Sequence, residues 1–270
     1  MIKISEWSSD FISYNGNRIH YYRTGDSKPS IILLHGITDN GLCWTPVARV
    51  LSENYDVIMP DARIHGLTEV GDNLYTYDSM ADDIATLIKE LNLDKVNIAG
   101  HSMGGNVAAL VAAKYPELIK KVVLEDPAFR FTNFSFLARG IMKLVLYITG
   151  FFLLSDDYEK LIKKCRKQSP TWAEEEYKPW AESKIQFKEQ NPKKTYDILK
   201  SRYNWREIFS NITCPLLLII PEKGVTNEKL ANKAISLFKS GKWIQIKGAG
   251  HNIRREQFDT FIQKVIDFLK

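Results

Sequence analysis

The stretch "NIAGHSMGGNVAAL", residues 97–110, places a serine between glycines where an apolar run meets an alanine-rich one. Glycine inside a regular element costs about 0.5–1 kcal/mol relative to alanine, so three glycines in six positions need a reason. The pattern G-x-S-x-G between a predicted strand and a predicted helix is typical of a serine on a strained turn, where the residues two before and two after must be small. We therefore predict that Ser102 is a nucleophile beside the positive end of the following helix. The alternative is a serine that only caps this helix.

The segments around this turn alternate between short β-branched runs and helical patterns. A hairpin is predicted over 10–23, with its turn at Asn15-Gly16, because both residues tolerate positive φ angles. Further strands are expected at 30–36, 55–61, 96–100, 121–126, 215–221 and 243–248, and helices at 77–93, 227–238 and 256–270. Strands that alternate with helices predict an α/β fold with a mostly parallel sheet flanked by helices on both faces.

The alternation stops after Pro127 and resumes near residue 213. Residues 128–212 show helical patterns and no convincing strand. We therefore predict a core domain formed by 1–127 and 213–270, with 128–212 inserted between two sheet strands as a helical cap. The apolar run 134–154 has the length of a membrane span, but Arg139, Lys143 and two glycines interrupt it, which favours a buried or cleft-lining cap helix.

The inserted segment is rich in aromatic residues. They either form a roof over a cleft, which implies an apolar substrate moiety, or make up the cap's own core. These residues are Phe134, Phe136, Phe151, Phe152, Trp172, Trp180 and Trp205.

Composition describes an ordinary globular chain of 270 residues, 44% hydrophobic, with a mean hydropathy of −0.24. Its three cysteines, Cys43, Cys165 and Cys214, are scattered without CxxC spacing, which argues against a disulfide framework and a structural zinc site. The N-terminus lacks the apolar core of a signal peptide, so we expect a cytoplasmic protein.

Charge is unevenly distributed along the chain. Residues 128–212 hold 16 Lys and Arg against 10 Asp and Glu, an excess larger than the whole chain's net charge of +5. We interpret this excess as a solvated helical surface, with an anionic substrate or an acidic membrane surface as alternatives. Nothing resembles a nucleic-acid-binding motif, so the expected partner is a small-molecule substrate.

Four motifs follow one another along the chain: "LLHGITDN" (33–40), "DARIHG" (61–66), "GHSMGG" (100–105) and "GAGHNIRREQFDTFIQKVIDFL" (248–269). In order and spacing they resemble the α/β-hydrolase family, over nearly the whole chain and least over 128–212. The resemblance implies the α/β-hydrolase fold. It also implies a base at His251, because the family places a histidine after the last strand. A serine hydroxyl needs such a base to accept its proton, whereas a histidine in a glycine-flanked loop can equally be a surface residue.

The resemblance also implies roles for residues near the first motif. The backbone N–H groups of Ile37 and Met103 are expected to form an oxyanion hole, which stabilises charge that appears in the transition state. His35 is expected to order the oxyanion loop by hydrogen bonding. The other histidines, His20, His65 and His101, are interpreted as structural. They show no metal-ligand spacing, and we expect neither a metal nor a cofactor.

The acid that would orient His251 is missing from its usual place. Family members commonly carry G-x-x-D after the next-to-last strand, but this chain has Pro221 and Gly224 at those positions. Our preferred acid is Asp126, at the end of the strand 121–126, a position that a minority of the family uses. Without any acid, the imidazole loses its correct tautomer, which can cost on the order of 10⁴ in kcat.

Two other carboxylates stay open as alternatives, as does the absence of any acid. Glu222 is the less favoured candidate, because it is closer in sequence to the usual place but longer. Glu125 is the other. Pro127 supports Asp126, since a residue before proline is biased toward the extended backbone of a strand end.

A serine nucleophile excludes the branch of the family that attacks with aspartate and favours acyl transfer. We predict a serine hydrolase, similar to carboxylesterases, that cleaves an ester, lactone or thioester of a small, largely apolar substrate. A C–C bond hydrolase uses the same triad and stays an alternative. A ligand-binding protein with vestigial turnover is another, supported by departures from the family pattern at Ile64, Pro221 and Gly224.

Overall fold

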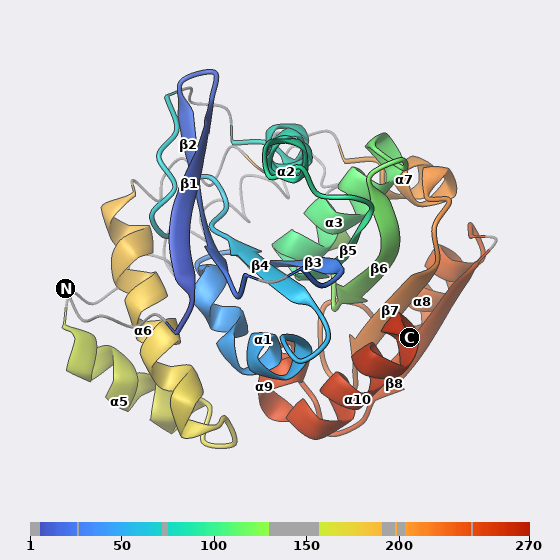
Figure 1. Cartoon of the computed structure of the whole chain (residues 1–270). Coiled ribbons are helices and arrows are strands. Elements are labelled where there is room, and N and C mark those ends of the chain that lie inside the picture. Colours follow the sequence, from blue (N-terminus) through green and yellow to red (C-terminus); the bar gives the residue numbers. More distant parts are fainter. Residues whose placement is uncertain are drawn as a thin grey trace, which may run out of the picture.

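The computed structural model describes residues 6–25, 27–71, 75–129, 157–190, 198, 203–238 and 240–270. Its centre is an eight-stranded sheet in the order β1-β2-β4-β3-β5-β6-β7-β8 (Figure 1). The strands are β1 (Ser8–Tyr14), β2 (Asn17–Arg23), β3 (Ser30–Leu34), β4 (Asp56–Pro60), β5 (Val96–His101), β6 (Ile119–Glu125), β7 (Leu216–Pro221) and β8 (Gly241–Ile246). β1 pairs antiparallel with β2, and β2 with β4, while all pairs from β4 to β8 are parallel. The predicted mostly parallel sheet is confirmed.

The β1–β2 hairpin turns at the predicted residues. Asn15 has φ 47° and Gly16 has φ 76°, and Tyr14 pairs with Asn17 across the turn. Two positive φ angles in a two-residue loop match the right-handed twist of the flanking strands.

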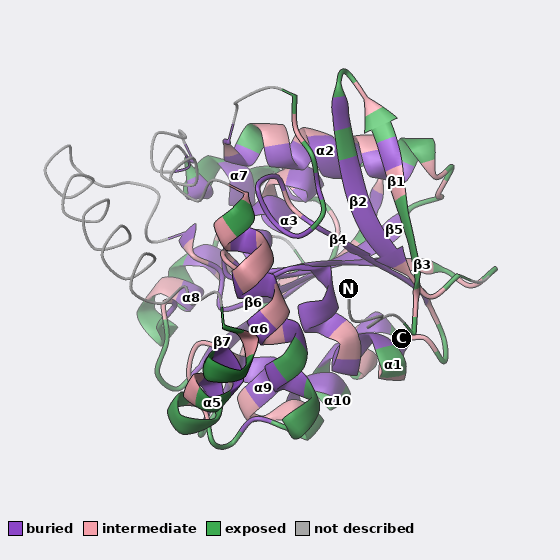
Figure 2. Ribbon diagram, turned by 90° about the vertical axis from the view of Figure 1, so that its left-hand side faces the viewer, coloured by how far each residue is buried: buried purple, intermediate pink, exposed green. Residues whose placement is uncertain are grey.

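Helices cover both faces of the sheet, as the alternation of elements predicts (Figure 1). Side chains at alternate positions of one strand point to opposite faces, so Ile32 of β3 packs in one core cluster and Ile31 in the other. On one face lie α2 (Tyr77–Glu90), α3 (Met103–Lys114), α7 (Trp205–Asn211) and α8 (Glu228–Ile235). On the other lie α1 (Thr45–Leu51), α9 (Ile253–Glu256) and α10 (Phe258–Leu269). β4, β5 and β7 are buried along their whole length between these layers (Figure 2).

α2 shows how local sequence specifies an element. The Thr76 side chain accepts from the Ser79 backbone N–H while the Ser79 side chain accepts from Thr76, a reciprocal capping box. The predicted apolar stripe is buried at Met80, Ile84, Leu87 and Ile88, and Leu91 at the helix end is partly buried.

The described part of the inserted segment consists of α5 (Tyr158–Gln168), α6 (Glu174–Glu189) and α7. α5 and α6 share a small apolar cluster, to which Trp172 and Trp180 belong, whereas Trp205 of α7 packs in the main core with Phe129. The other predicted roof aromatics, Phe134, Phe136, Phe151 and Phe152, and the apolar run 134–154 lie outside the described residues.

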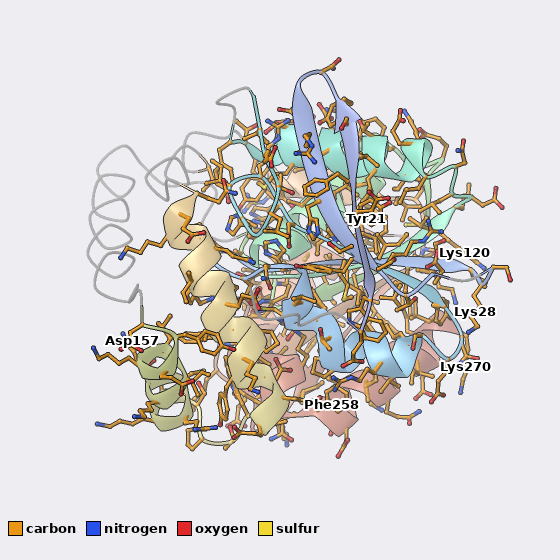
Figure 3. The ribbon with its side chains drawn as sticks, turned by 60° about the vertical axis from the view of Figure 1, so that its left-hand side comes forward. Tyr21, Lys28, Lys120, Asp157, Phe258 and Lys270 are labelled. Atoms are coloured by element: carbon orange, nitrogen blue, oxygen red, sulfur yellow. The ribbon has the colours of Figure 1, made fainter. Side chains whose placement is uncertain are left out.

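α5 begins after Asp157 and presents a basic outer face. Lys160, Lys163 and Lys167 are exposed, and basic side chains of this helix project away from the core (Figure 3). Over the residues that the structure describes, no helix combines the length and the hydrophobicity needed to cross a membrane.

Phe209→Ala tests whether α7 is part of the main core. Phe209 is fully buried, and its ring lies 5.2 Å from the rings of both Phe129 and Phe238. We expect the free energy of unfolding to fall by about 3–5 kcal/mol, the usual cost of such a cavity. Denaturant titration measures it, with Leu67→Ala as the exposed control. Equal stability of the two variants would show that α7 packs loosely.

Candidate active site

The turn between β5 and α3 has the strained geometry that its glycines predict. Ser102 has φ 52° and ψ −112°, a left-handed conformation that few non-glycine residues adopt. A Cβ on Gly100 would lie 2.2 Å from the Gly104 carbonyl oxygen, and a Cβ on Gly104 would lie 2.3 Å from the Leu34 carbonyl oxygen. The two glycines therefore permit the close approach of backbones on which the turn depends.

His251 lies in the loop between β8 and α9, next to this turn. The ring of His101, the residue before Ser102, lies 4.7 Å from the His251 ring, and His101 Nε2 donates to the His251 carbonyl at 2.9 Å. The His251 side chain is 36% exposed. Its own ring bonds through Nδ1, and no hydrogen bond joins it to the Ser102 hydroxyl in the described residues. Catalytic hydrogen bonds of unliganded sites often form only when substrate binds.

Asp126 is the carboxylate that the structure brings to His251. The distance between Asp126 Oδ2 and His251 Nδ1 is 2.6 Å. The Val225 N–H also donates to Oδ2 at 2.9 Å, and the Thr226 N–H donates to Oδ1 at 2.7 Å. Asp126 is fully buried, so these three donors replace the water that a carboxylate would otherwise bind.

The backbone of Asp126 differs from our expectation. Pro127 predicts an extended residue, but Asp126 has φ 37°, in the left-handed region. Its N–H still donates to the Ile219 carbonyl of β7 at 2.9 Å. The expectation is wrong because this strand pairing and the three hydrogen bonds of the carboxylate outweigh the local preference.

Gly224 leaves room for the Asp126 carboxylate at the end of β6. A Cβ on Gly224 would lie 2.3 Å from Asp126 Oδ2 and 2.2 Å from Pro221 Cγ. The Asp126 carboxylate therefore occupies space that any side chain at position 224, where the family commonly has its aspartate, would need. The Asp126 carboxylate and a side chain at position 224 could not both occupy this space, so Asp126 fits here only because residue 224 is glycine.

The two alternative carboxylates have other partners. Glu222 accepts from the Gly248 N–H at 2.8 Å on the surface. Glu125 is buried and accepts from the Arg254 N–H at 2.9 Å and from Arg254 Nη1 at 3.0 Å. Burial raises the pKa of Glu125 despite this arginine. Neither carboxylate hydrogen-bonds to the His251 ring.

The loop that follows β3 lies against Ser102, as the resemblance implies for an oxyanion loop. A Cβ on Gly36 would lie 3.5 Å from Ser102 Cβ. The Gly36 carbonyl accepts from His35 Nδ1 at 2.8 Å and from the Asp39 N–H at 3.2 Å. The Ile37 N–H belongs to the same peptide unit, so these bonds orient it.

Two buried neutral histidines hold this loop. His35 Nε2 accepts from the Ala62 N–H at 3.0 Å, and His65 Nε2 accepts from the Thr38 N–H at 3.1 Å. Burial lowers the pKa of His35. Burial, together with the charge that His35 would carry, lowers the pKa of His65 to about 3. The structural roles expected for these histidines agree with their contacts, but no sequence pattern indicated that His65 bonds to the loop after β3.

The loop after β4, which carries His65, is itself strained. Ile64 has φ 61° and is buried, where the resemblance expects glycine. A β-branched residue with positive φ is a true outlier. The backbone at this position thus has a conformation that glycine adopts readily.

The last predicted structural histidine is also fully buried. His20 Nδ1 lies 2.8 Å from Asp61 Oδ2, and His20 Nε2 lies 2.7 Å from Ser9 Oγ. In the described part of the chain, no group of three or more His, Cys, Asp or Glu side chains could hold a metal ion.

The neutral state of His65 makes stability depend on pH. The pKa of His65 is about 3 when folded and close to 6.5 when unfolded, so its contribution is complete above pH 6.5 and declines as pH falls toward 3. Between about pH 6.5 and 4.5 we expect the unfolding free energy to lose up to about 1.4 kcal/mol per pH unit from this residue. When unfolding free energies from urea titrations are plotted against pH, the curves of the wild type and His65→Asn should differ in slope by that amount. Parallel pH profiles would contradict the assignment.

Comparison with known proteins places the chain in a family. A sequence model of the alpha/beta hydrolase fold matches residues 29–165, just over half of the chain. N-formylmaleamate deformylase of Pseudomonas putida is 38% identical over 117 residues, which are 43% of this chain and 44% of that protein. 2-(Acetamidomethylene)succinate hydrolase of Mesorhizobium japonicum is 38% identical over 104 residues, 38% of this chain and 37% of that protein. The first curated relatives are thus matched over only 30% to 44% of their length.

Solved structures share the whole architecture. The structure of an E-2-(acetamidomethylene)succinate hydrolase superimposes with a TM-score of 0.80 at 22% identity, covering 98% of this chain and 99% of that chain. At this identity the likeness is one of fold. Together with the sequence match and the strand order, it shows that the chain belongs to the alpha/beta hydrolase fold family.

Proposed function

We propose that this protein is a serine hydrolase that cleaves a carboxylic ester, lactone or thioester of a small, largely apolar substrate through an acyl-enzyme. The observation that carries the proposal is the 2.6 Å contact between Asp126 Oδ2 and His251 Nδ1, formed beside the strained turn of Ser102. A carboxylate on Nδ1 leaves Nε2 as the proton acceptor of the imidazole.

In the proposed mechanism, Ser102 Oγ attacks the carbonyl carbon while His251 Nε2 takes the hydroxyl proton. The N–H groups of Ile37 and Met103 donate to the oxyanion, which exists only in the tetrahedral intermediate. Collapse of the intermediate breaks the bond to the alcohol oxygen or thiol sulfur, which takes the proton from His251. Water, deprotonated by His251, then attacks the acyl-enzyme carbonyl carbon. The second intermediate collapses with cleavage of the bond to Ser102 Oγ, which takes the proton back from His251, and the acid is released.

The departures from the family pattern fit an enzyme better than a vestigial binding protein. The Asp126 carboxylate fills the space at Gly224, and Ile64 has a positive φ, a conformation that glycine adopts readily. A scaffold without turnover has no need to keep a buried carboxylate on the imidazole. Ligand binding without turnover and C–C bond hydrolysis stay as alternatives.

The choice of substrate draws on composition and on the relatives. The apolar part of the proposal rests on the aromatic composition of 128–212 alone. The described Trp172 and Trp205 pack within apolar clusters, which matches the alternative in which these aromatics form a core. Of the two relatives described above, one is named as a deformylase and the other as a hydrolase of an acetamido compound. Formyl and acetyl amides therefore belong beside esters in any substrate panel.

Asp126→Asn is expected to lower kcat by about 10⁴, because an amide cannot hold the imidazole in the tautomer that accepts the serine proton. Glu222→Gln removes one of the two alternative carboxylates, which accepts from the Gly248 N–H on the surface, and should leave kcat near the wild-type value. Both are measured on one p-nitrophenyl ester. Wild-type turnover in Asp126→Asn would refute the assignment.

Ser102→Ala tests the nucleophile with p-nitrophenyl acetate and butyrate. We expect kcat to fall by roughly 10⁴–10⁶, as for other serine hydrolases that lose the attacking oxygen. The exposed Ser210, whose hydroxyl donates to the Glu207 carbonyl, provides the matched control Ser210→Ala. If Ser102→Ala keeps the wild-type rate, Ser102 is not the nucleophile. If the wild type binds these esters without cleaving them, the binding alternative replaces the proposed hydrolase.

A further inference from the structure

A cluster of buried charges lies beside the oxyanion loop and was not apparent from the sequence. Its members come from four separate elements: the loop after β3, the end of β6, the inserted helix α6, and α9. They are Asp39, Glu125, Glu176, Lys184, Arg254 and Arg255, all less than 9% exposed. Buried charges are costly unless they are paired, so this cluster requires the four elements to dock together.

Asp39 contacts all three of the basic residues in this charge cluster. Its Oδ1 accepts from Lys184 Nζ at 2.7 Å, and its Oδ2 lies 3.2 Å from Arg255 Nη1 and 3.6 Å from Arg254 Nη2. Burial opposes its charge, but Arg255, Lys184 and Arg254 outweigh burial and hold the pKa of Asp39 well below its usual range. One carboxylate thus joins the oxyanion loop, the inserted helix and the helix that follows His251.

Lys184 also holds the backbone of the oxyanion loop. Its Nζ donates to the Thr38 carbonyl at 2.9 Å, in addition to Asp39. Thr38 has φ 68°, a strained conformation that needs such contacts to persist. A second contact from α6 joins Gln186 Oε1 to Asn40 Nδ2 at 2.9 Å.

The position of Asp39 bears directly on the Ile37 N–H. The Asp39 N–H donates to the Gly36 carbonyl, and that carbonyl shares a peptide unit with the Ile37 N–H. In a trans peptide, the N–H and C=O groups point in opposite directions. Donors that hold the carbonyl on one side therefore direct the N–H to the other.

We infer that Lys184 is a positioning residue for the oxyanion hole: through Thr38 and Asp39, the inserted helix α6 fixes the peptide that presents the Ile37 N–H. The inference rests on the proposed function for its catalytic consequence, but the ordering of the loop can be measured without it. Hydrolysis thereby depends on the docking of α6, although Lys184 itself does not touch the reacting atoms.

Lys184→Met removes the ammonium and keeps an unbranched chain that fits a buried site. The matched control is Lys178→Met, which removes an exposed charge from the same helix. Hydrogen exchange read by mass spectrometry should rise several-fold in peptides covering residues 36–41 of Lys184→Met, and remain unchanged over β5. With p-nitrophenyl acetate, kcat should fall roughly 10- to 100-fold while KM changes little, as expected when a catalytic group is misplaced by about 1 Å.

Unchanged exchange over residues 36–41 in Lys184→Met would overturn the inference, as would a kcat no lower than that of Lys178→Met. Lys184→Arg, which keeps the charge and its donors, should recover most of the activity. If Lys184→Met does not fold, Lys184→Gln replaces it, with the same expected direction in both measurements. A wild type that cleaves no ester would refute the proposed function alone, and the exchange result would still decide whether Lys184 orders the loop.

Discussion

The hydrogen bond between His251 Nδ1 and Asp126 Oδ2 is the contact on which the arrangement of the site depends. It joins residues 125 positions apart in the chain, and it forms because β6, β7 and β8 are parallel neighbours. Parallel strands bring their carboxyl ends to one edge of the sheet, so the loops after them meet there. The buried carboxylate is satisfied only when the loop after β7 donates Val225 and Thr226, which ties three loops to one charge.

Backbone strain gathers at this same edge. Four non-glycine residues with positive φ follow four parallel strands directly or within a few residues: Thr38 after β3, Ile64 after β4, Ser102 after β5 and Asp126 after β6. Each such residue costs on the order of 1–3 kcal/mol and persists only where its surroundings determine it. The rigid sheet, the buried histidines and the charge cluster supply those surroundings. Strain at one sheet edge is thus a property of the whole layer of loops that carries the proposed chemistry.

Side chains in this layer compensate for one another across the sequence. Gly224 leaves the space that the Asp126 carboxylate fills, so a change at the usual acid position is matched by a carboxylate from the neighbouring strand. Lys184 of α6 forms an ion pair with Asp39 in the loop after β3. The inserted segment is therefore part of the site's support, in addition to any role it has over a cleft.

Local patterns in the sequence were enough to predict the strand segments, the Asn15-Gly16 turn, the buried stripe of α2 and the tight turn at Ser102, because each of these depends on neighbours within a few residues. The mostly parallel pairing of the strands followed from their alternation with helices. The sequence alone left the acid open among three carboxylates, misjudged the backbone of Asp126, and gave no sign of the charges around Asp39. These features were decided by the tertiary structure. They depend on which side chains fit one buried space and which charges meet there, and both follow from contacts between residues more than a hundred positions apart in the chain.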